Sequence, residues 1–99
     1  MQIESSVNGR EAVLTLTGRL NARTAPGLEE LLESLPDEVQ TLTLDLGGLH
    51  YLAAAGLRVI EAARRRLAAQ NGSVALKNVA PEVEETLELT GFSTILPIV

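Results

Sequence analysis

The chain has 99 residues, a formal net charge of −5 at pH 7 and 45% hydrophobic residues, a size and composition that allow one domain with one core. The acidic balance argues against nucleic acid or an anionic membrane surface as the main partner. The absence of cysteine excludes disulfide and thiol chemistry. No apolar run approaches the roughly 20 residues of a membrane helix, and the polar N-terminus is unlike a signal peptide, so we expect a cytoplasmic protein without membrane insertion.

The N-terminal residues predict a β-hairpin. Apolar and polar residues alternate over 3–7 and again over 12–17, which is the period of a half-buried strand. Asn8-Gly9 lies between the two runs and is the dipeptide best suited to a two-residue type I′ turn. We therefore expect two antiparallel strands joined by that turn.

A helix and a third strand are predicted next. The helix begins near Thr24, a residue type that often caps helices, and leucines at 28, 31, 32 and 35 form one apolar stripe. Pro36-Asp37 ends this helix. Leucine then occupies alternate positions over 41–46, which predicts a strand with one buried face.

A second helix is predicted from about Ala54 to Gln70, where Asn71-Gly72 provides a stop signal. Apolar residues at 57, 60, 63 and 67 can face a sheet. Glu61 and Arg65 have the spacing of an i,i+4 ion pair on the opposite side. This helix is therefore expected to be amphipathic and to cover a sheet.

The remaining residues predict a strand over 73–77, a helix that begins at Pro81 and is closed by Gly91, and a short edge strand over 94–99. Strands that alternate with helices favour crossover connections and a mostly parallel sheet, to which the first hairpin adds an antiparallel pair. No linker, repeat or low-complexity tract divides the chain. We expect one α/β domain over residues 1–99.

Residues 44–57 carry the most information about function. They predict a buried strand, a tight turn at Gly47-Gly48, a short apolar stretch and the first turn of a helix. The unpaired N–H groups of a helix start make this a common place for a switch or an anion site. Here Ala53-Ala54-Ala55 stands where a regulatory or catalytic side chain would be expected.

This stretch resembles the STAS domain of anti-sigma factor antagonists, in which Asp-Ser-Ser-Gly-Leu opens the helix where this chain has Ala53-Ala54-Ala55-Gly56-Leu57. Residues 16–21 resemble the Leu-x-Gly-x-Leu-Asp pattern of the family, except that Asn21 replaces the acid. Residues 78–83 and 87–92 resemble its last helix and exit. The resemblance implies a STAS domain over residues 1–99, with a mixed, mostly parallel sheet, an N-terminal hairpin and helices mainly on one face.

The resemblance also implies a function. In the family, a kinase-type anti-sigma factor phosphorylates the serine that matches Ala54, and alanine has no hydroxyl to accept a phosphate. The implied role is a protein-binding regulator that binds such an anti-sigma factor and releases a sigma factor without that switch. The surface expected to contact the partner comprises His50, Ala54, Leu57, Arg58 and Glu61.

Several alternatives to this role stay open. The alanines can mark a constitutively unphosphorylated form, a divergent branch with another partner, an engineered site, or a purely structural helix start, since alanine is the best helix former. STAS proteins also resemble regulatory subunits of lipid-transport ATP-binding cassette systems, whose partner is the transporter ATPase. A small-ligand sensor that uses a pocket near Asp45 is a third hypothesis.

The remaining polar residues indicate no enzyme. In the family, acids at the positions of Asp45 and Asn21 border the phosphorylation pocket, although Asp45 can equally cap the nearby loop. His50 is the only histidine and lies in no cluster of metal ligands. No nucleophile elbow or phosphate-binding loop is present. We therefore expect no catalytic residue, no metal and no cofactor, and the sequence leaves the oligomeric state open.

Overall fold

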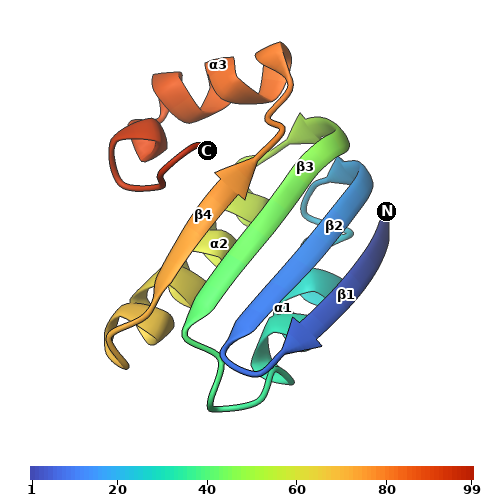
Figure 1. Cartoon of the computed structure of the whole chain (residues 1–99). Helices are drawn as coiled ribbons and strands as arrows, with labels where there is room; N and C mark the ends of the chain where they lie inside the picture. The colour runs from blue at the N-terminus through green and yellow to red at the C-terminus, as the bar shows by residue number, and fades with distance from the viewer.

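The computed structural model describes residues 1–99 and contains four strands, three α-helices and one short 3₁₀ helix; after the first two strands, helices and strands alternate along the chain (Figure 1). The strands are β1 (Gln2–Asn8), β2 (Glu11–Leu20), β3 (Thr41–Leu52) and β4 (Ser73–Lys77). The helices are α1 (Ala25–Glu33), α2 (Ala54–Ala68), α3 (Pro81–Leu89) and the short 3₁₀ helix η1 (Phe92–Thr94). The sheet order is β1-β2-β3-β4, with an antiparallel first pair and two parallel pairs, which confirms the expected fold class.

The core lies between the sheet and the helices. Figure 1 shows α1 and α2 together behind the sheet, while α3 lies at the carboxyl ends of β3 and β4. The predicted inward faces of β2 and β3 are confirmed, because Leu14, Leu16, Leu42, Leu44 and Leu46 are all fully buried. The opposite face of the sheet carries mostly polar side chains, with Val13 and Tyr51 exposed among them, and no helix covers it.

The first hairpin forms, but its turn differs from the expected one. Asn8 pairs with Glu11, so the loop residues are Gly9 and Arg10 rather than Asn8 and Gly9. Only Gly9 has a positive φ, of 62°, and a type I′ turn would require positive φ at both loop residues. The alternation of buried residues along β2 sets this register, and the turn accommodates it with a glycine at its first loop position.

β3 is longer than predicted, because Gly47 and Gly48 lie inside the strand instead of forming a turn. The pairing with β2 shifts twice: Thr15 pairs with Asp45 but Thr17 pairs with Gly48. The second shift follows Gly18. Such bulges insert extra residues into one strand while its neighbours stay paired. A side chain at position 48 would begin 3.1 Å from the hydroxyl of Thr17, so the glycine permits a close approach of the strands.

The helix boundaries follow the prediction within a few residues. α1 begins after Thr24, but the Thr24 hydroxyl accepts a hydrogen bond from the Asn21 backbone N–H at 2.9 Å instead of capping the helix. α1 ends before Pro36 is reached. α2 ends at Ala68, and Asn71 then adopts a left-handed conformation with φ of 63°.

The C-terminal residues do not form the expected edge strand over 94–99. η1 takes up the first part, and only one parallel bridge, between Leu76 and Ile98, connects the end of the chain to β4. Pro97 contributes its carbonyl to the Leu76 N–H at 2.8 Å but has no N–H of its own to continue a ladder. None of the helices is long and apolar enough to cross a membrane.

Candidate functional site

The start of α2 lies at the carboxyl end of the sheet, directly after β3 (Figure 1). The Ala53 N–H donates to the Leu20 carbonyl at 2.9 Å, which joins the helix start to the end of β2. Of the three alanines, Ala54 is exposed, while Ala53 and Ala55 are partly buried. The position that the family resemblance equates with the phosphorylated serine is therefore at the surface.

Gly56 lets α2 lie close against the strand ends. Its backbone is buried, and a Cβ atom built there would lie 2.8 Å from Leu20 Cδ2 and 3.1 Å from Leu52 Cδ1. Real Cβ atoms do not approach carbon that closely in well-packed interiors. The glycine after the alanines therefore sets the distance between the helix tip and the sheet.

The residues expected to contact a partner are only partly brought together. His50 and Arg58 are exposed, and Arg58 lies one helical turn after Ala54 on the same side of α2. Leu57, by contrast, is 2% exposed and belongs to the core. The expectation that Leu57 offers its side chain to a partner does not fit the structure, because its side chain faces the sheet.

Asn21 and Asp45 do not border a common pocket. Asp45 pairs with Thr15, whereas Asn21 follows the last residue of β2. At about 3.3 Å per strand residue this separates them by roughly 20 Å. Neither residue lines a cavity or groove. Asp45 lies well inside the strand, and not at its carboxyl end, because β3 continues beyond it to Leu52.

Both side chains instead accept local hydrogen bonds. Asp45 Oδ1 accepts from the Gly47 N–H at 3.0 Å and from Asn78 Nδ2 at 3.2 Å, which connects β3 to the end of β4. Asn21 Oδ1 accepts from the backbone N–H groups of Arg23 and Thr24 at 3.0 and 3.1 Å. In the manner of Asx turns, the bonds to Asn21 shape the entry into α1, and the bond from Gly47 to Asp45 shapes the bend of β3.

Glu61 is held by two arginines of α2. The predicted pair with Arg65 is confirmed at 2.9 Å, and Arg64 adds two bonds, from Nε at 2.8 Å and from Nη2 at 2.7 Å. The hydrogen bonds from Arg64, followed by those from Arg65, lower the pKa of Glu61 to about 2. The i,i+3 spacing of Glu61 and Arg64 is the signal in the sequence from which the second pair could have been predicted.

Sequence reasoning missed a cation–π contact near the carboxyl ends of β2 and β3. The Arg19 guanidinium lies over the Tyr51 ring, 4.4 Å from its centre, and Tyr51 is 43% exposed. Arg19 and Tyr51 are directly paired neighbours on β2 and β3. The pairing could not be read from the sequence, because it depends on the second bulge.

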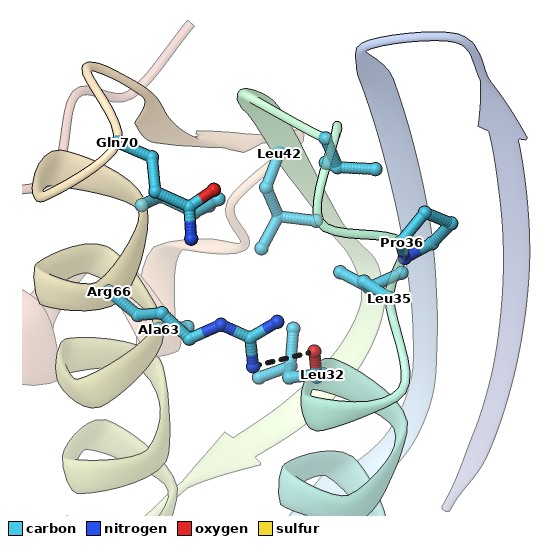
Figure 2. A pocket seen from close by; sticks show the side chains of 9 residues that line it. Leu32, Leu35, Pro36, Leu42, Ala63, Arg66 and Gln70 are labelled. Atoms are coloured by element: carbon cyan, nitrogen blue, oxygen red, sulfur yellow. Dashed lines mark hydrogen bonds between the residues drawn. The ribbon is translucent and has the colours of Figure 1, made fainter.

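A small cavity separates the C-terminal parts of α1 and α2 (Figure 2). Its apolar lining includes Leu32, Leu35, Leu42 and Ala63, and Figure 2 shows Arg66 crossing it to donate to the Leu32 carbonyl at 3.3 Å. The cavity has a volume of about 20 Å³, which is room for roughly one water molecule. It is too small for an organic ligand. No three side chains of the His, Cys, Asp and Glu type are grouped closely enough to hold a metal ion.

Comparison with known proteins identifies the family. The STAS domain family model matches residues 2–99. BtrV of Bordetella bronchiseptica, described as a candidate anti-sigma factor antagonist, is 34% identical over 87 residues, which cover 87% of this chain and 75% of BtrV.

Two solved structures share the fold. The crystal structure of an anti-sigma factor antagonist from Mycobacterium paratuberculosis superposes with a TM-score of 0.86 at 21% identity, covering 98% of this chain and 83% of that one. The unphosphorylated form of the Bacillus anti-sigma factor antagonist SpoIIAA superposes with a TM-score of 0.76 at 18% identity, covering 99% and 86%, and its phosphorylated form gives 0.75 at 19% identity, covering 99% and 89%. The chain therefore belongs to the STAS domain family and is similar to its anti-sigma factor antagonists.

Proposed function

We propose that this protein binds an anti-sigma factor of the kinase class and thereby releases a sigma factor, without the serine switch of its family. The observation that carries the proposal is the exposed Ala54 in the first turn of α2, at the position that matches the phosphorylated serine. SpoIIAA has been solved in both a phosphorylated and an unphosphorylated form, and this chain superposes on the two about equally well. The STAS fold therefore forms with or without a phosphate on the serine.

The proposed docking surface consists of His50, Ala54, Arg58 and Glu61. The methyl group of Ala54 allows a partner backbone to approach the helix tip closely. A carboxylate at that position would have to lose its water in a close contact, which is costly, and it would compete with the partner for Arg58, which lies one turn later on the same side of α2. The proposal therefore predicts that a carboxylate at position 54 weakens the complex.

The test is a calorimetric titration of the purified protein with the kinase-class anti-sigma factor from the same organism. Ala54→Asp should weaken binding by at least about tenfold, because it puts a bulky, hydrated carboxylate at the centre of the contact and ties up Arg58. Ala68→Asp is the matched control, because Ala68 is exposed on the same helix about 20 Å away at 1.5 Å per residue. Equal affinities for Ala54→Asp and the wild type would refute docking at this tip.

Phosphate incorporation tests the missing switch. With ATP and the anti-sigma factor, the wild type should gain no phosphate by intact-protein mass spectrometry, since Ala54 has no hydroxyl. Ala54→Ser, alone or with Ala53→Asp, should become a substrate. Phosphate on the wild type would show that another residue has taken over the switch. Binding of a transporter ATPase in place of the anti-sigma factor would instead favour the role of a transport-system subunit.

A further inference from the structure

A shallow groove runs along the solvent side of α2 and is separate from the small cavity between α1 and α2. It is lined by Arg58, Glu61, Ala62 and Arg65 of α2 and by Phe92 of η1, and it encloses about 450 Å³. The four α2 residues are spaced at i, i+3, i+4 and i+7, so they form one continuous stripe of the helix surface. The C-terminal segment supplies the other wall.

The charge of this groove is opposite to that of the whole chain. Arg58 takes part in no ion pair, and Arg65 shares the single carboxylate of Glu61 with Arg64. The groove is lined by two arginines and one glutamate, so it has a net positive charge in a protein whose formal net charge is −5. Arg65 keeps 76% of its side chain exposed although it is paired, so it can bind a second carboxylate.

The groove also offers an apolar surface between its cations. Phe92 is the only phenylalanine of the chain; it packs against the core and is only partly buried. Ala62, which also lines the groove, is exposed and contributes only a methyl group. An occupant with both an apolar side chain and carboxylates fits this arrangement, because burial of the apolar part strengthens the neighbouring charge pairs.

The groove continues from the helix tip. Ala54 precedes Arg58 by one turn, and Arg65 follows Arg58 by two turns. A partner that covers the start of α2 can therefore extend its contact along α2 toward η1. Building on the proposed function, we infer that the groove receives an acidic segment of the anti-sigma factor, whose carboxylates pair with Arg58 and Arg65 and whose apolar side chain contacts Phe92.

The first experiment tests the groove without the anti-sigma factor. The probe is a synthetic peptide with blocked termini in which pairs of glutamates alternate with pairs of leucines. It is titrated into the isotope-labelled protein, whose signals are followed by nuclear magnetic resonance. The Nε–H signals of Arg58 and Arg65 and the ring signals of Phe92 should shift together. A peptide with glutamine in place of glutamate is the control and should leave them unchanged. Equal shifts with both peptides, or none with either, would overturn the inference.

The second experiment measures affinity for the anti-sigma factor. Arg65→Gln is the deciding variant, because Arg65 lies outside the docking surface of the proposed function and Glu61 keeps its bonds to Arg64. The variant should bind about fivefold more weakly, with a shallower salt dependence. Arg10→Gln is the matched control, because Arg10 is an exposed arginine in the turn between β1 and β2 and does not line the groove.

The outcomes separate the two proposals. If Arg65→Gln binds like Arg10→Gln while Ala54→Asp weakens binding, the groove is not used and the proposed function stands. If the wild type binds no anti-sigma factor, the proposed function fails and so does the identity of the partner inferred here. The peptide titration then decides whether the groove binds acidic segments at all.

Discussion

Replacement of Gly56 by alanine should destabilise the protein, although alanine is the better helix former. Gly56 is the third residue of α2, and a Cβ atom there would lie 2.8 Å from Leu20 Cδ2 and still nearer to Leu20 Cγ. Leu20 is fully buried and Leu52 is 4% exposed, so neither side chain has free space into which to move. The extra methyl group must therefore strain the core or push the helix tip outward.

The size of the effect follows from two opposing contributions. Overpacking of a close-packed core costs about 1–3 kcal/mol. The gain in helix propensity from glycine to alanine offsets at most about 1 kcal/mol of that cost. We expect a net loss of about 1–2 kcal/mol in the free energy of unfolding.

Gly27 provides a matched control. It is the third residue of α1, and no heavy atom lies within 4 Å of the Cβ that alanine would add. Gly27→Ala should therefore stabilise the protein by up to about 1 kcal/mol. The stability of both variants is measured by urea denaturation followed by far-ultraviolet circular dichroism. Relative to the wild type, the urea midpoint of Gly56→Ala should fall and that of Gly27→Ala should rise, each by about 1 M. A midpoint for Gly56→Ala at or above that of the wild type would refute the packing argument.

Three further predictions concern stability. The lowered pKa of Glu61, about 2 against an ordinary 4.5, means that its contribution is present above pH 4.5 and is lost as the pH falls toward 2. Because water screens this exposed cluster, Glu61→Gln should cost about 1 kcal/mol at pH 7 and almost nothing near pH 2; parallel stability curves of variant and wild type between pH 7 and 2 would contradict this. Leu44→Ala, at a fully buried position in β3, should cost about 2–5 kcal/mol in urea denaturation. Asn71→Ala should lower stability by about 1 kcal/mol in thermal unfolding, because Asn71 has a φ of 63° and alanine tolerates the left-handed region less well.

Local patterns were sufficient to predict most of the fold. The alternation of leucines along β2 and β3 and the stripe of α2 depend only on residues a few positions apart, and the buried faces agree with them. The ion pair between Glu61 and Arg65 follows from helix spacing in the same way. The predicted ends of helices and strands were less accurate, because the end of an element depends on what its last residues contact in the folded protein.

The differences at β3 show what local patterns lack. Gly47-Gly48 has the composition of a turn, and the sequence offered no sign that β2 would continue to pair beyond it. The bulges arise where two strands distant in the chain adjust their register to each other. As a result Arg19 is paired with Tyr51, while the continuation of β3 to Leu52 leaves Asp45 far from Asn21.

The sequence by itself determined the order of strands and helices and the absence of a hydroxyl at position 54, because these depend on local periodicity and on covalent chemistry. Only the tertiary structure decided that Ala54 is exposed at the carboxyl end of the sheet, and that Phe92 forms a groove with Arg58 and Arg65. These features depend on packing between segments far apart in the chain, which no short stretch of sequence specifies.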